Sequence, residues 1–389
     1  MLVSSSFIDR RLESRGCTKV FIRTESTNNE GAFLMIDRWG KLVRHESVGI
    51  FKDLIRGCLF LASQLYRAAM NIRNRLYDRG WKTVHRVDIP VISVGNLTVG
   101  GTGKSPTVTM LAKWFRDRNI RVAVISRGYG AGRDGINDEA REMEKRLPDV
   151  PHLQNPNRYA AAKVAQDELS MQVLIMDDGF QHRRLHRDLE IVLLDATDPF
   201  GLGYLLPRGM LRESIRSLRR ADVVLLTRSD IVSRQQIAAT RLTVQRFALN
   251  ATWVEANHQP TSLVNASGDV LSINTLAGKK VLAFSGIGNP TAFLETLRMC
   301  GAEVIESIVF PDHHAYTSAD VIRISSPKET PVDMIVCTGK DLAKLDVDSV
   351  GPFPLWALQV DLSCSAGWEA LDDRLRRIVD MISLDPTDE

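Results

Sequence analysis

Cysteine is scarce in this chain, and its five residues never form a C-x-x-C pair. Such scattered thiols exclude a disulfide framework and a cysteine-based zinc site, and they fit a reducing compartment. The first ten residues reach charge before any apolar signal-peptide core can form. We therefore expect the catalytic part of the protein to face the cytoplasm.

Charge of one sign is also in short supply. The 50 Lys and Arg residues nearly balance the 47 Asp and Glu residues, which leaves a formal net charge of +3. A general nucleic-acid binder would carry a concentrated basic excess, so we expect no nucleic-acid partner. No segment indicates an obligate protein partner. The chain of 389 residues is long enough for two globular domains.

Helical periodicity is missing from residues 1–46, which we expect to form a poorly structured extension. An over-long start assignment is an equal alternative, with Met35 as a downstream start. The sequence leaves open whether these residues belong to the native protein.

Long apolar runs are also missing from residues 47–85, although apolar side chains recur there at helical spacing. The longest uncharged run, residues 57–66, has ten residues, about half of what a bilayer-spanning helix needs. Residues 41–90 hold ten Lys or Arg against four Asp or Glu. A basic amphipathic helix of this kind can lie in the interface of an anionic membrane. The alternative is a helix packed on its own domain, with its Arg heads in water.

From Arg86 onward, short apolar strands alternate with helical segments, which is typical of βαβ units around a parallel sheet. The pattern predicts an α/β fold with a P-loop NTPase-type parallel sheet and a second, smaller α/β domain. We place the first domain at residues 86–250, a connection at 251–278 and the second domain at 279–389.

A glycine-rich segment follows the strand expected at residues 87–94 and opens a helix. This is the context of a phosphate-binding loop, in which backbone N–H groups and the helix N-terminus face the phosphates. Lys104 would reach the β- and γ-phosphates, and the Ser105 hydroxyl would bind Mg²⁺. The strict motif has glycine where Thr98 stands. The expected nucleotide-binding residues are Thr98, Val99, Gly100, Gly101, Thr102, Gly103, Lys104 and Ser105.

Two adjacent carboxylates, Asp177 and Asp178, end the buried strand expected at residues 173–176. They repel each other unless a cation lies close by, and a P-loop needs an acid at the end of a neighbouring strand to position its metal. We therefore expect Asp177 and Asp178 to bind Mg²⁺. The alternative is a turn that caps the next segment.

Other polar segments allow more than one interpretation. Asp138 opens an expected helix, where a carboxylate favours the dipole for structural reasons alone. His313 and His314 follow an aspartate in the second half, where they form either a loop or a group that handles protons. Arg127 and Arg212 face either substrate phosphate or ordinary surface partners.

Thr227-Arg228-Ser229-Asp230 follows an expected strand and is similar to the N-K-x-D pattern that reads guanine. It supports a rival function, a P-loop nucleotide switch or metallochaperone-type GTPase that acts on a partner. A soluble small-molecule kinase is a third candidate.

Taken in order, eight motifs in this sequence resemble those of the tetraacyldisaccharide 4′-kinase (lipid A 4′-kinase) family. They are VISVGNLTVGGTGKSP, ISRGYG, NDEA, MDDGFQHRRL, LPRGMLRE, VVLLTRSD, FSGIGNP and FPDHH, between about residues 48 and 362. The resemblance implies transfer of the ATP γ-phosphate, with Mg²⁺, to the 4′-hydroxyl of a tetraacylated glucosamine disaccharide 1-phosphate, a glycolipid. It also implies a site between two α/β domains and an N-terminal helix on the cytoplasmic face of the inner membrane.

The resemblance also implies roles for single residues. Gln181 falls on the nucleotide side, and Glu213 matches the acid that is associated with the metal pair Asp177 and Asp178. Asp138 would work with one histidine of the pair His313 and His314 to activate the sugar hydroxyl. As a separate hypothesis about mechanism, Arg127 would join Lys104 and Mg²⁺ in neutralising charge on the transferred phosphoryl group. The family glycine before that aspartate is Asn137 here.

Overall fold

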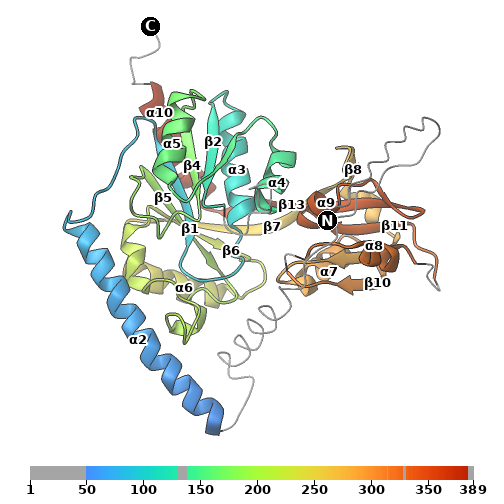
Figure 1. The fold of residues 1–389 in the computed structure, drawn as a ribbon, viewed down its shortest axis with the longest axis horizontal. Coiled ribbons are helices and arrows are strands. Elements are labelled where there is room, and N and C mark those ends of the chain that lie inside the picture. The colour runs from blue at the N-terminus through green and yellow to red at the C-terminus, as the bar shows by residue number, and fades with distance from the viewer. Residues whose placement is uncertain (1–49, 129–137, 313, 327–329, 384–389) are drawn as a thin grey trace, which may run out of the picture.

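The computed structural model describes residues 50–128, 138–312, 314–326 and 330–383 (Figure 1). The extension predicted at residues 1–46 lies outside the described residues, and so does His313. The side chain of Asp138 is likewise not described, although its backbone begins a helix. None of the helices searched in this part of the chain combines the length and the apolar character that crossing a bilayer requires.

The chain alternates strands and helices along most of its length. The strands are β1 (Val91–Asn96), β2 (Val122–Ser126), β3 (His152–Gln154), β4 (Val173–Asp177), β5 (Leu189–Asp195), β6 (Val223–Thr227), β7 (Thr252–Val264), β8 (Val270–Ser272), β9 (Lys280–Ser285), β10 (Glu303–Val309), β11 (Met334–Thr338), β12 (Ser349–Val350) and β13 (Phe353–Ala366). The α-helices are α2 (Ile50–Asp78), α3 (Lys104–Arg116), α4 (Asp138–Arg146), α5 (Arg158–Asp167), α6 (Arg234–Gln245), α7 (Pro290–Met299), α8 (Ser318–Ser325), α9 (Gly339–Leu345) and α10 (Trp368–Ser383). Short 3₁₀ turns are η1 (Gly201–Gly203), η2 (Ile215–Arg220) and η3 (Ile273–Leu276).

One sheet runs through both lobes of the molecule, in the order β10-β9-β11-β13-β7-β6-β5-β1-β4-β2-β3 (Figure 1). Every neighbouring pair on this path is parallel except β13 and β7. Helices cover both faces in each lobe, as parallel sheets require. The predicted α/β fold with a parallel sheet is therefore confirmed.

The larger lobe buries two apolar faces of its strands. Alternate residues of β1, β4 and β5 pack with α3 on one side, and the intervening residues pack with α5 and α6 on the other. This packing fixes the carboxyl ends of β1 and β4 side by side, because the two strands are paired in parallel from Val91 and Leu174 onward. Both the glycine-rich loop and the acidic pair emerge from that edge.

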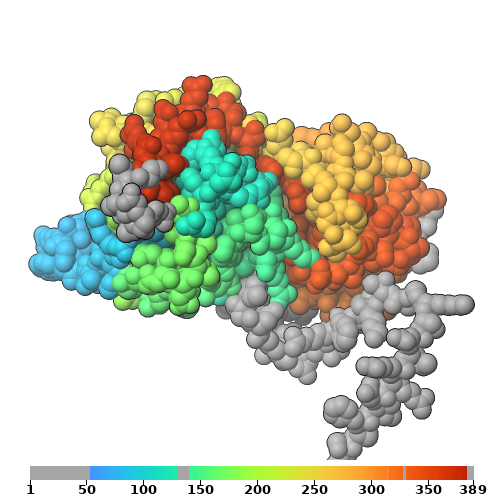
Figure 2. All heavy atoms as spheres, turned by 90° about the horizontal axis from the view of Figure 1, so that it is seen from above, coloured from blue at the N-terminus to red at the C-terminus, as the bar shows by residue number. Residues whose placement is uncertain are grey.

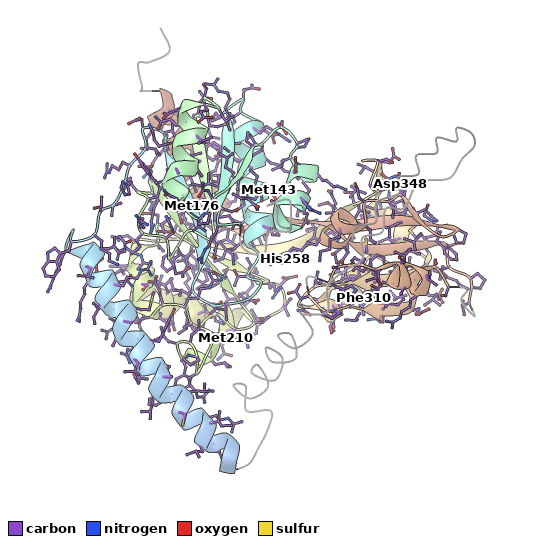
Figure 3. All side chains as sticks on the ribbon, in the orientation of Figure 1. Met143, Met176, Met210, His258, Phe310 and Asp348 are labelled. Carbon is purple, nitrogen blue, oxygen red and sulfur yellow. The ribbon has the colours of Figure 1, made fainter. Side chains whose placement is uncertain are left out.

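The segment predicted as a connection, residues 251–278, joins the lobes as a strand of the sheet. β7 pairs with β6 in parallel at its first residues and with β13 in antiparallel along most of its length. β13 in turn pairs with β11 of the smaller lobe. The lobes are thus joined by a two-stranded ribbon, and His258 of β7 lies between them (Figure 3).

The last helix, α10, packs on the larger lobe, although we placed its residues in the second domain. Leu371, Leu375 and Ile378 are buried in the same core as Leu111 and Phe115 of α3. The chain crosses from the smaller lobe to the larger one along β13, and α10 covers the sheet beside α3. The domain limits themselves stay a prediction.

Helix α2 presents apolar side chains outward and polar side chains toward the protein. Its outward residues recur at helical spacing and are 57–75% exposed: Leu54, Leu61, Leu65 and Ile72. Its buried residues include Arg56 and Ser63. Ordinary surface helices have the opposite arrangement, with apolar residues toward the core. The helix lies at the margin of the larger lobe (Figures 1 and 2).

Candidate active site

The glycine-rich loop joins the end of β1 to the start of α3. Gly100 and Gly103 have φ angles of 112° and 88°, which side-chain-bearing residues rarely adopt. The loop is held from within by a 2.9 Å hydrogen bond from Asn96 Nδ2 to Thr102 Oγ1. Thr227 Oγ1 of β6 donates to the Thr102 carbonyl at 3.1 Å. Hydrogen bonds from β1 and β6 therefore hold the loop that precedes α3.

Two features of this loop, the packing of His258 and the backbone at Thr98, were not predicted from the sequence. A Cβ on Gly103 would lie 3.2 Å from His258 Nε2, so the imidazole of β7 packs directly against the loop. Thr98 does not take a left-handed backbone conformation, so its position does not require glycine. Instead, the segment around Thr98 pairs with residues 210–212, through Val99 N to Met210 O at 2.8 Å.

The acidic pair lies at the end of β4, facing the loop. Lys104 Nζ lies 3.6 Å from Asp178 Oδ1, and Arg212 Nη1 contacts both oxygens of the same carboxylate at 2.8 and 2.9 Å. Burial alone would raise the pKa of Asp178, but Lys104 and Arg212 more than offset it and hold that pKa below its usual value. Asp178 is therefore ionised at neutral pH. Asp177 is buried, and its Oδ1 accepts the backbone N–H of Asp178 at 2.8 Å.

A third cation, absent from the sequence predictions, lies behind this pair. Arg158 is 5% exposed and its Nη2 donates to the Asp177 carbonyl at 3.2 Å. Burial, the largest effect, lowers the pKa of its guanidinium, and the charges of Asp178 and Asp177 oppose that shift. The sequence offered a weak signal, since Arg158 is the first helical residue after the cap Asn157. Arg127 is exposed at the end of β2 and acts electrostatically on Arg158.

Gln181 ties the acidic segment to the loop. Its Nε2 donates to the Asn96 carbonyl at 2.9 Å, and its Oε1 accepts from Arg212 Nη1 at 3.4 Å. The predicted nucleotide-side residue thus lies between β1 and the Arg212 guanidinium.

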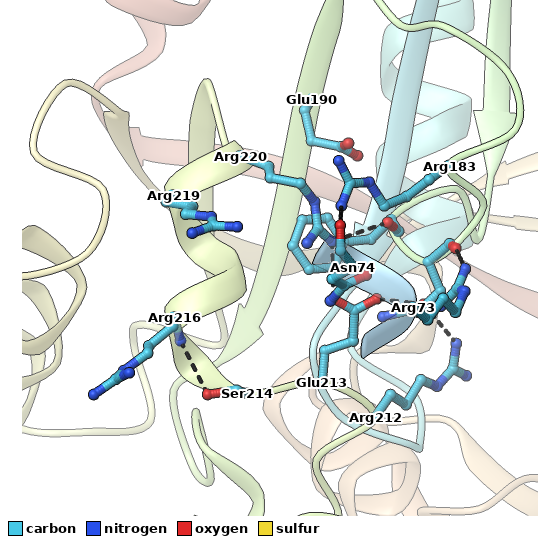
Figure 4. A network of polar contacts seen from close by, with 12 residues as sticks. Arg73, Asn74, Arg183, Glu190, Arg212, Glu213, Ser214, Arg216, Arg219 and Arg220 are labelled. Carbon is cyan, nitrogen blue, oxygen red and sulfur yellow. Dashed lines mark hydrogen bonds and ion pairs between the residues drawn. The ribbon is translucent and has the colours of Figure 1, made fainter. Parts of the chain in front are cut away.

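Glu213 is fully buried beside these residues, and its described contacts are with protein cations and an amide. Its Oε2 accepts from Asn74 of α2 and from Arg220, each at 3.0 Å, while Arg73 Nη1 lies 3.8 Å from Oε1 (Figure 4). Its assignment to the metal stays a prediction.

The residues predicted to activate the sugar hydroxyl come from different lobes. Asp138 begins α4, which packs on α9 of the smaller lobe, where Glu142 faces Gly339. His314 follows β10, stacks on Phe310 with ring centroids 4.8 Å apart, and its Nε2 lies 2.9 Å from Asp320 Oδ2. This nitrogen is therefore already engaged within its own lobe. Asp138 and the His313/His314 pair stay a prediction.

The residues at the loop suit a magnesium ion that is bound together with a nucleotide. Among the residues with a described structure, no three His, Cys, Asp or Glu side chains converge as a metal-binding cluster. Mg²⁺ in kinases needs only one or two carboxylates, because substrate phosphates and waters complete its oxygen shell. Ser105, in the first turn of α3, and the ionised Asp178 supply such oxygens.

Comparison with known proteins agrees with this geometry. The family model described as Tetraacyldisaccharide-1-P 4′-kinase matches residues 55–380. A tetraacyldisaccharide 4′-kinase of Anaeromyxobacter sp. (strain K) is 39% identical over 340 residues, which cover 82% of this chain and 89% of that protein. One of Syntrophus aciditrophicus (strain SB) is 40% identical over 309 residues, covering 73% and 82%.

A solved structure is similar over most of the chain as well. It is LpxK from Aquifex aeolicus, an "apo" form in complex with ATP, which has 32% sequence identity and a TM-score of 0.68. The alignment covers 83% of this chain and 99% of that one. The loop, the acidic pair and the two-lobed sheet thus occur in a chain that belongs to the tetraacyldisaccharide-1-P 4′-kinase family.

Proposed function

We propose that this protein transfers the γ-phosphate of ATP to the 4′-hydroxyl of a tetraacylated glucosamine disaccharide 1-phosphate, a step of lipid A biosynthesis. The observation that carries the proposal is the contact of Lys104 with Asp178 at the mouth of a phosphate-binding loop, in a member of this family. Lys104 would reach the β- and γ-phosphates and neutralise charge that develops on the transferred group. Arg127 is a further candidate for neutralising that charge.

Asp177, Asp178 and Ser105 would hold Mg²⁺, which would neutralise negative charge on the phosphates. Gln181 would line the nucleotide side. We keep Glu213 as a candidate that supports this set, although its contacts are with Asn74 and Arg220.

Asp138, with one histidine of the pair His313 and His314, would take the proton of the sugar hydroxyl. Of the two, His314 has its Nε2 engaged with Asp320, which leaves its Nδ1 side for any such role. Alignment contributes more to phosphoryl transfer than the base does, so loss of Lys104 should cost more than loss of Asp138.

The protein also meets its lipid acceptor at a membrane, in our proposal on the cytoplasmic face of the inner membrane. The support is α2, whose outward residues Leu61 and Leu65 are 66% and 75% exposed. Exposed Arg67 and Arg75 on the same helix would attract anionic headgroups. The acyl chains of the acceptor would remain in the bilayer while the sugar enters the site between the lobes.

The deciding measurement is phosphate transfer from γ-labelled ATP to tetraacyldisaccharide 1-phosphate in mixed micelles, for the wild type and for Asp138→Asn. Transfer by the wild type that collapses in the variant supports the substrate and the base together. Transfer that survives the substitution keeps the kinase and removes Asp138 from catalysis. Bound nucleotide without any transfer would return the protein to the nucleotide-switch class.

A further inference from the structure

The polar side of α2 is joined to the two loops that build the candidate active site. Tyr66 Oη donates to the Arg212 carbonyl at 2.9 Å. Asn74 Nδ2 donates to Glu213 Oε2 at 3.0 Å, and Arg73 donates to the Gln181 carbonyl. The contacts converge on a few neighbouring residues beneath the helix (Figure 4).

These contacts lead directly to the acidic pair. The backbone of Arg212 is held by Tyr66 on one side, and its own N–H donates to the Leu97 carbonyl of the phosphate-binding loop at 2.7 Å. The guanidinium of the same residue binds both oxygens of Asp178 and also Gln181. Asp178 in turn faces Lys104. A shift of Arg212 would therefore move the carboxylate partner of the catalytic lysine.

The chemistry of the contacts makes them costly to lose. Glu213 is completely buried, so removal of the Asn74 amide leaves a desolvated carboxylate oxygen with fewer donors. Burial, followed by the charge of Glu213, raises the pKa of Tyr66, so its hydroxyl keeps the proton that it donates. If Tyr66 and Asn74 only anchored the helix, they could bond any part of the larger lobe, but both bond the segment that carries Arg212.

We propose that Tyr66 and Asn74 of α2 are positioning residues of phosphoryl transfer, which hold Arg212 in place against Asp178. The helix that presents apolar residues outward is thereby also a support for the segments that carry Gln181 and Arg212. This inference rests on the proposed kinase function, because it requires that Asp178 and Lys104 act on ATP and Mg²⁺.

The test compares full-length wild type with Tyr66→Phe and Asn74→Ala, and uses Asn71→Ala as a matched control. Asn71 lies on the same helix, one turn before Asn74, and is exposed. The measurements are the Kd for ATP with Mg²⁺, and kcat and KM for both substrates in mixed micelles. Thermal melting of each variant shows that the fold is kept.

We expect Tyr66→Phe to lower kcat/KM for ATP about five-fold, as for loss of one neutral hydrogen bond. Asn74→Ala should lower it about ten-fold or more, because a charged acceptor loses its donor. The KM for the glycolipid should stay at the wild-type value in both, and Asn71→Ala should match the wild type throughout. In an Arg212→Ala background, Tyr66→Phe should have no further effect, because Tyr66 acts by placing the Arg212 guanidinium against Asp178.

Two outcomes separate this inference from the function beneath it. If the wild type binds no ATP, the proposed function fails and the inference fails with it. If the wild type binds ATP and Tyr66→Phe and Asn74→Ala keep its kcat/KM for ATP, only the inference is overturned. Full additivity of Tyr66→Phe with Arg212→Ala would overturn it as well.

Discussion

At the scale of the residue, the site concentrates positive charge around the carboxylate of Asp178. Lys104, Arg212 and Arg158 all act on Asp178, and together they outweigh the effect of its burial on its pKa. Such preorganised charge suits phosphoryl transfer, in which stabilisation of oxygen charge matters more than covalent chemistry. The cation nearest to the phosphate positions, Lys104, should carry the largest single effect.

Lys104→Ala should lower kcat by at least about 10²-fold, the usual cost of one preorganised donor, and by more than Asp138→Asn does. The side chain is mostly buried, and its one partner among the described residues is Asp178, which keeps Arg212, so the melting temperature should change little. Steady-state kinetics and melting check this. Lys163→Ala on α5, whose exposed pair is with Asp167, is the control and should be fully active. Near-wild-type turnover of Lys104→Ala would remove it from the phosphate-binding role.

His182 gives the protein a predictable acid sensitivity. Burial, followed by the positive charge of Arg158, lowers the pKa of His182 from 6.5 to about 4. Between these pH values the unfolded chain binds the proton and the folded chain does not, so stability falls as the pH falls from 6.5 to 4. His182→Gln should lose this contribution. Its melting temperature should therefore fall less steeply than that of the wild type across that window, and parallel curves would contradict the assignment.

The residues that the sequence identified were those with a local pattern. Apolar strand patterns and glycines lie next to two groups of residues and make them predictable: the loop from Thr98 to Ser105, and the pair Asp177 and Asp178. Arg158 and His258 have no such pattern, because each reaches the site through pairing of distant strands and helices. The helix cap before Arg158 indicates where the helix begins, but not that this side chain will be buried against the carbonyl of Asp177, 19 residues away.

At the scale of the element, apolar periodicity located the buried strands well. The strand predicted at residues 173–176 lies within β4, and the helix that we expected Asp138 to open is α4. We did not predict β7 as a strand, because Pro260 and polar residues interrupt the alternation of apolar side chains. Its pairing with β6 and β13 is set by the tertiary fold. Sequence order placed the residues of α10 with the second domain, whereas the helix packs in the same core as α3, a long-range contact that sequence order does not show.

The outward side of α2 should govern membrane binding. Leu65→Glu places a charge on a side chain that is 75% exposed, so it should not disturb folding. It should reduce sedimentation with anionic phospholipid vesicles several-fold, because a carboxylate is costly to bury in the apolar layer and is repelled by the anionic headgroups. Leu249→Glu is the control, since Leu249 is 81% exposed and follows α6 rather than lying on α2. Equal sedimentation of the two variants would contradict the membrane role of this helix.

α10 should contribute to the stability of the larger lobe. Leu375 is fully buried against the core of α3, so Leu375→Ala should cost about 2–5 kcal/mol of unfolding free energy. Met381→Ala on the same helix, at 45% exposure, should cost much less. Denaturant unfolding of the two variants measures the difference. A small effect of Leu375→Ala would mean that α10 is dispensable for this core.

At the scale of the whole molecule, the two lobes are fastened at more than the β7–β13 ribbon. Asp361 of β13 accepts from Lys113 of α3 at 3.1 Å and also pairs with Arg146 of α4. Lys145 of α4 pairs with Asp346, which follows α9. Helix α4 is therefore held by both lobes, and its first residue is Asp138, the predicted base. The placement of that residue depends on how closely the lobes meet.

Gly339 tests this dependence, because it begins α9 where α9 meets α4. A Cβ at this position would lie 2.8 Å from Glu142 Oε1, so the Glu142 side chain must move, and a leucine side chain would compete with it for the space between the two helices. Gly339→Leu should therefore lower kcat about 10- to 100-fold, as displacements of about 1 Å do, while the Kd for ATP stays near the wild-type value. The phosphate-binding loop lies in the other lobe and keeps its own contacts, such as Asn96 to Thr102. Lys280→Leu adds the same side chain on the exposed start of β9 and should be fully active. If Gly339→Leu lost as much ATP affinity as kcat, the added side chain would be disturbing the nucleotide site instead. Normal turnover of Gly339→Leu would show that catalysis does not depend on the contact between α4 and α9.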